Sequence, residues 1–197
     1  MFYMIKIFSL KSDMFSIGRD LAGKTCNPTG FCVLVEKNKE VMCLKTLYSD
    51  EEILKEIFFY PPVETIVAVD APLMKNGIPK MRMADKLLKK YGAMPPTMKS
   101  MRCLSIRAYT LSKKLENMRY KIIEVFPTAT AKILGIYDKS YVKMSRILKV
   151  EVKNRHELDA YLCALTGKLF LEYKTTEVGD MEGKIIIPLE GLTINWL

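Results

Sequence analysis

Residues 14 to 30 read MFSIGRDLAGKTCNPTG, an apolar run that ends on Asp20, then a polar stretch, then the start of a second apolar run. Residues 18 to 25, GRDLAGKT, fit the phosphate-loop pattern G-x-x-x-x-G-K-[ST]. A phosphate loop needs a helix that begins at the Lys-Thr pair, because backbone amides at the helix N-terminus hold the phosphates. Pro28 and Gly30 disfavour that helix. The stretch therefore predicts a strand that ends at Asp20 and a loop that leads into a hairpin.

The order of the remaining segments predicts the fold class. Three strands form a meander, and a helix, a buried strand, a group of basic helices, a second buried strand, a long helix and a last strand follow. These strands and the two non-basic helices cover residues 14–20, 30–37, 40–47, 49–60, 63–70, 120–127, 154–173 and 184–189. This is the connectivity of the RNase H fold, an α/β fold. We expect an RNase H-like mixed sheet, a three-strand antiparallel meander extended by parallel strands, flanked by helices.

Length and composition predict one soluble domain. The chain has 197 residues, 49% of them hydrophobic, which is enough for a single core. We expect this domain to cover residues 14–197, with a leader or extra segment over 1–13. Charged residues interrupt the apolar N-terminus, and no run reaches transmembrane length, so we expect a cytoplasmic protein with no membrane partner. Five scattered cysteines and one histidine support neither a disulfide framework nor a zinc site.

Four acidic residues are the candidate catalytic and metal-binding residues. In the RNase H connectivity the first strand lies parallel to the fourth, so Asp20 and Asp70 meet at one sheet edge. Glu124 lies in the next buried strand and Asp159 on a half-buried face of the long helix, whereas Glu157 is expected outside. Such oxygen ligands suit Mg²⁺ or Mn²⁺ and two-metal phosphodiester hydrolysis, with Asp20 as the bridging ligand. Taken singly, each acid also fits a turn or a solvated position.

The basic residues are concentrated in one helical region. Between Lys80 and Lys121 there are twelve basic residues and only two acidic ones, which more than accounts for the formal net charge of +9. Such a concentration favours a polyanionic partner, DNA or RNA, over a merely solvated helix face. Lys24, beside the predicted carboxylate site, is a candidate contact to a substrate phosphate.

Motifs along most of the chain resemble a known family. From Phe15 to Pro188 the sequence is similar to a family of uncharacterised prokaryotic proteins described as predicted nucleases of the RNase H fold. A segment at residues 156–160 also resembles the last-helix signature of Holliday-junction resolvases, whose acids bind magnesium. The motifs that carry these resemblances are GRDLAGKTCNPTG, VAVDAPL, the R-x-x-D of Arg82 and Asp85, MRCLSIRAYTL, VFPTAT, HELDAYLCALT and VGDMEGKIIIP.

The resemblance implies a set of site residues. It implies that Asp20, Asp70, Glu124 and Asp159 are the metal-site residues, and that three arginines contact phosphate: Arg82, Arg102 and Arg107. The chain departs from the family pattern at Arg19, where an apolar residue is usual and where strand alternation places the side chain on the face opposite Asp20. A fold-level likeness is an indirect argument for activity.

Three functions are therefore open at this point. The first is a metal-dependent nuclease, and the second is a non-catalytic nucleic-acid-binding protein with the RNase H fold. The third is an ATP-binding phosphohydrolase, because actin-like kinases share the fold and also begin with a strand that ends in an acid and glycines. Metal-dependent cleavage, binding without turnover, and stabilisation by ATP would distinguish them.

Overall fold

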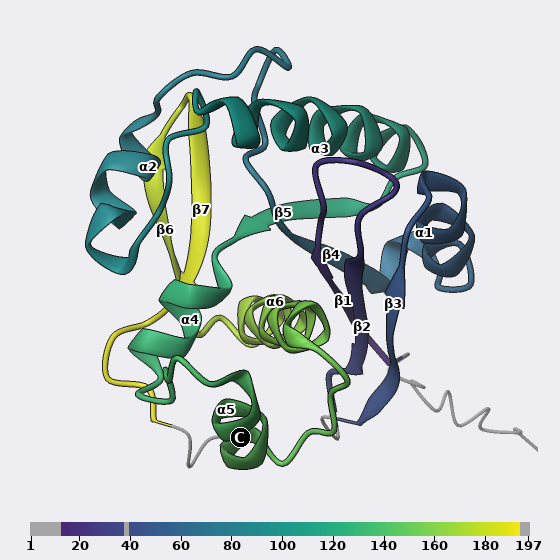
Figure 1. The fold of residues 1–197 in the computed structure, drawn as a ribbon. Coiled ribbons are helices and arrows are strands. Elements are labelled where there is room, and N and C mark those ends of the chain that lie inside the picture. The colour runs from purple at the N-terminus through teal and green to yellow at the C-terminus, as the bar shows by residue number, and fades with distance from the viewer. Residues whose placement is uncertain (1–12, 38–39, 194–197) are drawn as a thin grey trace, which may run out of the picture.

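The computed structural model describes residues 13–37 and 40–193, so most of the expected segment 1–13 lies outside the described residues. One seven-stranded mixed sheet runs through the molecule in the order β3-β2-β1-β4-β5-β7-β6 (Figure 1). The strands are β1 (Phe15–Asp20), β2 (Thr29–Val35), β3 (Val41–Leu47), β4 (Thr65–Asp70), β5 (Lys121–Val125), β6 (Thr175–Asp180) and β7 (Gly183–Pro188). The predicted meander of β1, β2 and β3, extended by the parallel strands β4 and β5, is confirmed.

Helices cover both faces of the sheet (Figure 1). The α-helices are α1 (Asp50–Ile57), α2 (Met83–Leu87), α3 (Lys99–Asn117), α4 (Pro127–Ile133), α5 (Tyr141–Leu148) and α6 (Arg155–Leu171), and the 3₁₀ helices are η1 (Pro62–Glu64) and η2 (Leu88–Tyr91). Apolar side chains of α1 and α3 pack with one face of β1, β2 and β4, while α4, α5 and α6 pack on the opposite side. In the described residues, no helix has the length and apolar character of a membrane span.

Three elements were not expected from the sequence. The α4 and α5 helices are short and follow β5. The sequence pattern predicted no helix between that strand and the long helix that begins near residue 154. The β6 strand, TTEVGD, was expected to be a loop because it contains a glycine and lacks buried alternation. It forms an antiparallel pair with β7, which itself lies parallel to β5. Pairing across the sheet, which no local pattern records, makes β6 a strand.

The loop after β1 agrees with the sequence argument against a phosphate loop. Residues 21–28 form an irregular loop, and β2 begins at Thr29, so the chain returns as a strand after Gly23-Lys24-Thr25. The side-chain hydroxyl of Thr29 accepts a hydrogen bond from the backbone amide of Ala22 at 3.1 Å and closes the loop. The helix N-terminus that a phosphate loop requires is replaced here by a hairpin connection.

The α6 helix lies directly on the sheet because two strand positions have no side chain. A methyl group at Gly18 would overlap the backbone of Ala160 and Ala164, and one at Gly30 would overlap the carbonyl group of His156. The hydroxyl of Ser16 donates a hydrogen bond to the carbonyl oxygen of Ala164 at 2.7 Å. These contacts fix the helix axis over β1 and β2, so its first turn lies at the ends of the strands.

We predict that Gly18→Ala and Gly30→Ala each lower the free energy of unfolding by roughly 2–3 kcal/mol, because the added methyl group displaces α6. Gly23→Ala is the matched control, since its methyl group would lie 3.3 Å from the backbone nitrogen of Leu104, a contact that a small shift relieves. Urea unfolding followed by circular dichroism measures the difference. Equal stability of Gly18→Ala and the wild type would contradict the close approach.

Candidate active site

Two aspartates meet where neighbouring parallel strands end. Asp20 is the last residue of β1 and Asp70 the last residue of β4, and the two are directly paired in the strand register. The strands run parallel, so their carboxyl ends lie at the same sheet edge. Both aspartates are only partly exposed. The sequence-based expectation that these two residues come together agrees with this arrangement.

The first turn of α6 adds two further side chains to this edge. Asn154 caps the helix by accepting a hydrogen bond from the amide of Glu157. His156 and Asp159 are three positions apart, so they lie on one helix face. His156 Nδ1 lies 2.7 Å from Asp20 Oδ2, and Asp159 Oδ2 lies 3.3 Å from Arg155 Nε. The helix thus brings a histidine and a third carboxylate to the two strand ends.

Burial and neighbouring charges raise the pKa of two of the three aspartates. Burial raises the pKa of Asp70 well above its usual value, and the charges of Asp20, Asp159 and Glu124 raise it further. Burial, followed by the charge of Asp20, raises the pKa of Asp159 to about 6. The hydrogen bond to Asp20 raises the pKa of His156. Negative charge at this edge is therefore incompletely compensated by the protein itself.

The donor atoms of this edge fit a hard divalent cation. Asp20, Asp70 and Asp159 offer carboxylate oxygens, which Mg²⁺ and Mn²⁺ prefer. A cation would offset the burial and the repulsion that together raise the pKa of Asp70 and Asp159. Within residues 13–37 and 40–193, no three His, Cys, Asp or Glu side chains are already gathered so that they could hold a metal ion. Side-chain rotation at the edge would be needed to complete a ligand set.

Glu124 lies near this group, but its oxygens are already bound. Arg82 donates to both carboxylate oxygens of Glu124, with Nη1–Oε2 and Nη2–Oε1 distances of 2.6 Å. The amide of Leu73 donates a third hydrogen bond at 2.7 Å, and Asp85 binds the other side of the Arg82 guanidinium. Arg82, Asp85 and Glu124 are all buried. The structure therefore places Glu124 in a buried ion-pair cluster rather than free at the edge.

Of the basic residues expected to contact phosphate, two are buried and two are exposed. Arg82 is in the ion-pair cluster. Arg107 is bound to Asp50 at 2.8 Å and to three backbone carbonyl oxygens, two of them in the loop after β1, at Ala22 and Lys24. Arg102 and Lys24 are exposed. Arg107 therefore holds the loop that carries Lys24, and the exposed pair is available to a ligand.

A small cavity adjoins Asp70. Its volume is about 60 Å³, and it lies between the ends of β4 and β5 and the segment that leads into α3. Asp85 and Glu124 contribute its acidic part, while Met94 and Met101 contribute apolar surface. Asp70 and Glu124 both line this cavity, and the charge of Glu124 contributes to the raised pKa of Asp70 after burial, Asp20 and Asp159.

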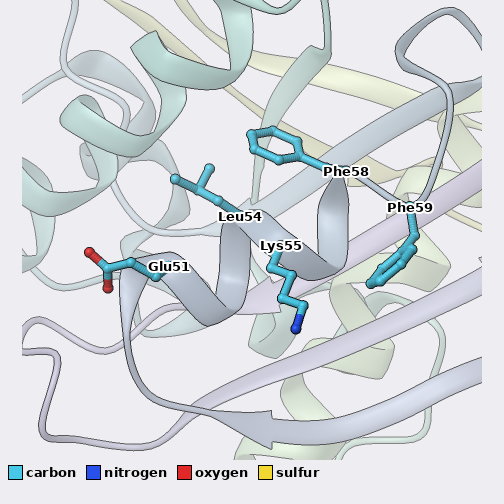
Figure 2. Close-up of a pocket in the computed structure, with 5 residues that line it drawn as sticks. All are labelled: Glu51, Leu54, Lys55, Phe58 and Phe59. Carbon is cyan, nitrogen blue, oxygen red and sulfur yellow. The ribbon is translucent and has the colours of Figure 1, made fainter.

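A larger groove lies elsewhere, on α1. It has a volume of about 490 Å³, and Figure 2 shows its lining side chains along that helix, Leu54, Phe58 and Phe59 with Glu51 and Lys55. Its surface is mainly apolar, and Phe59 is 69% exposed. The groove contains one acid and one lysine, so it lacks the converging carboxylates of the strand edge. We therefore place the candidate chemistry at the strand edge and not in this groove.

Sequence reasoning missed His156 and misplaced Glu157. A histidine three positions before Asp159 was a usable signal, because that spacing puts both side chains on one helix face. Glu157 was expected outside, but it is 2% exposed. It accepts hydrogen bonds from the hydroxyl of Thr46 and the amide of Lys153. This burial comes from β3 and the loop before α6, contacts that helix periodicity does not reveal.

Arg19 occupies the face of β1 opposite Asp20, as strand alternation predicts. Its side chain is fully buried, and its three guanidinium nitrogens have no hydrogen-bond partner among the described residues. Burial, with a smaller effect of the Arg107 charge, lowers the pKa of Arg19 to about 10. A cationic side chain is therefore enclosed behind the strand that carries Asp20, at a cost in stability.

Comparisons with known proteins support the fold. No protein-family model matches the chain, and no curated protein matches it. Among solved structures, the chain is similar to the RuvC protein of T. thermophilus, determined in complex with a Holliday-junction substrate. The TM-score is 0.52 and the identity 12%, and the similarity covers 81% of this chain and 96% of the RuvC chain. This likeness shows an RNase H-like, RuvC-like fold.

We predict that Asp159→Asn stabilises the metal-free protein at pH 8 by on the order of 1–3 kcal/mol. The folded-state pKa of Asp159, about 6, lies above its unfolded value of 3.8. Between these two pH values the folded protein therefore keeps a proton on Asp159 that the unfolded chain has released. Stability therefore falls as pH rises from about 4 to 6 in the wild type, and Asn removes this loss.

Chemical denaturation in EDTA at pH 4 and pH 8 measures the effect. Glu151→Gln, which removes an exposed acid from the loop before α6, is the matched control and should change stability little. If Asp159→Asn raised the free energy of unfolding as much at pH 4 as at pH 8, the raised pKa of Asp159 would not be the cause of the gain, and the prediction would be contradicted.

Proposed function

We propose that the protein is a nuclease that hydrolyses phosphodiester bonds of nucleic acid with Mg²⁺ or Mn²⁺ held by Asp20, Asp70 and Asp159. One observation carries the proposal: two strand-end aspartates lie in register, and a third carboxylate from α6 is close enough to raise the pKa of Asp70. A bound divalent cation supplies an activated water and neutralises charge on the departing oxygen. The RuvC-like fold supports the same reaction class.

The surrounding residues position these carboxylates. His156 holds the Asp20 carboxylate through its Nδ1 atom and can carry a proton at that position. Arg155 binds one oxygen of Asp159 from the preceding turn. Arg107 fixes the loop after Asp20 through the carbonyl oxygens of Ala22 and Lys24.

We assign structural roles to two of the residues that the sequence placed in the site. Glu124 and Arg82 satisfy each other in a buried pair, and breaking such a pair costs roughly 3–5 kcal/mol, so neither is free to bind a ligand without loss of stability. Lys24 and Arg102 remain as phosphate contacts. Gly23, which carries the chain to Lys24, lies against the backbone of Leu104 in α3, and Arg102 lies two positions earlier on that helix.

The second function, nucleic-acid binding without catalysis, is favoured by a different observation. Asp20, Asp159 and Glu124 each already have a protein partner, His156, Arg155 or Arg82, and the described residues hold no ready-made set of three metal ligands. A protein of this kind would bind DNA or RNA with strong salt dependence and without turnover. The third function, an ATP-binding phosphohydrolase, has less support, because β2 follows the loop where a phosphate-loop helix would begin.

We predict that the wild type cleaves at least one of four labelled substrates in the presence of Mg²⁺ or Mn²⁺: single-stranded DNA, RNA, an RNA–DNA hybrid or a four-way DNA junction. Asp20→Asn and Asp70→Asn should each reduce the rate by at least about a hundredfold, because each removes a ligand charge from the site. Gel-resolved cleavage, with circular dichroism as a check of folding, measures the effect.

Glu177→Gln, which changes an exposed acid on β6, is the matched control and should cleave at the wild-type rate. Equal cleavage by the wild type and Asp20→Asn would contradict the proposed site. Binding by the wild type with cleavage of no substrate would favour the non-catalytic function instead.

A further inference from the structure

A second group of basic residues leads into the carboxylate edge from the other side. Between Lys139 and Arg155 the chain has six basic residues and one acidic residue, Glu151. This density is similar to that of the segment from Lys80 to Lys121. All six basic residues are exposed, and we call five of them the α5 strip: Lys143, Arg146, Lys149, Lys153 and Arg155.

The α5 helix presents part of this strip because its other face is buried. Met144 and Leu148 pack with the core beside α6. Lys143 and Arg146 lie on the exposed side, and Lys149 ends the helix in a left-handed conformation with φ of 53°. Arg146 and Lys149 line an open groove of about 450 Å³ with the chain at residues 150–152. Two cationic side chains thus border a shallow, solvent-accessible depression.

The strip reaches the candidate active site through its last residue, Arg155. Lys153 is held in place through its backbone amide, which donates to Glu157 Oε2 at 2.7 Å, and its side chain is exposed. Arg155 contacts Asp159 directly. The other exposed phosphate candidates, Lys24 and Arg102, lie on the loop after β1 and on α3, against the opposite face of the sheet from α5 and α6. Basic surface is therefore present on both sides of the three aspartates.

We propose that the α5 strip binds backbone phosphates of the nucleic-acid substrate, so that the substrate crosses the carboxylate edge and extends onto both basic surfaces. This inference rests on the proposed function. Lys143 and Lys149 are six residues apart, which is about 9 Å along a helix. Successive phosphates of one strand rise by about 3.4 Å, so this part of the strip spans about three phosphates. The implied substrate is a strand that continues beyond the cleaved bond on the α5 side.

The first test is a charge-neutralised variant, Arg146→Gln/Lys149→Gln/Lys153→Gln, compared with Lys37→Gln/Lys55→Gln/Lys184→Gln. The second variant removes the same number of exposed charges from the turn after β2, from α1 and from β7, outside both basic surfaces. Fluorescence anisotropy with a 30-nucleotide DNA in EDTA measures binding without cleavage. The strip variant should bind at least about tenfold more weakly, and the slope of log K against log salt should fall by about 2–3.

The control variant should change affinity by less than about threefold. Equal losses in the two variants, or no loss in the strip variant, would overturn the proposal. So would displacement of the DNA from the wild type by poly-glutamate at the same charge concentration, because that result would indicate an acidic protein partner.

These outcomes are separate from those of the proposed function. If the wild type binds DNA through the strip but cleaves none of the four substrates, the strip assignment stands and the nuclease proposal fails. If cleavage depends on Asp20 while the strip variant binds and cleaves as the wild type does, the nuclease proposal stands and the strip assignment fails.

Discussion

The close contact between α6 and the sheet is the constraint on which the candidate site depends. Gly18 and Gly30 leave no side chain between the strands and the helix, and Ser16 donates a hydrogen bond to the helix backbone. Because the helix lies so near β1 and β2, its first turn reaches the strand ends and carries His156 and Asp159 to Asp20. Side chains at either glycine would move this turn away from the edge.

The acids of this region differ in how far a cationic side chain of the protein compensates their charge, and this difference separates candidate metal ligands from acids that support the fold. Burial raises the pKa of Glu124, but two hydrogen bonds from Arg82 and one from the amide of Leu73 act in the opposite direction. At the strand edge the pKa of Asp70 and of Asp159 is raised, first by burial and then by the neighbouring Asp20, so the protein alone leaves this charge unbalanced. Such an imbalance is typical of sites that bind a cation or a proton during function.

The sequence predicted the arrangement of β1 to β5 and the meeting of Asp20 with Asp70, because strand periodicity and connection rules act on local pattern and topology. It did not predict the pairing of Glu124 with Arg82, because the two residues are 42 positions apart in the sequence. The β6 strand escaped notice because pairing with β7, not its own composition, makes it a strand. The three-residue spacing between His156 and Asp159 predicts that both lie on one helix face. The contact between this face and Asp20 could be seen only in the structure.

The most direct test is an anomalous difference map from crystals of the wild-type protein soaked in MnCl₂. The account predicts a manganese peak bound by carboxylate oxygens of Asp20, Asp70 and Asp159, with Arg82 still paired to Glu124. A peak bound by Glu124 with Arg82 displaced, or no peak at this edge under saturating Mn²⁺, would contradict it.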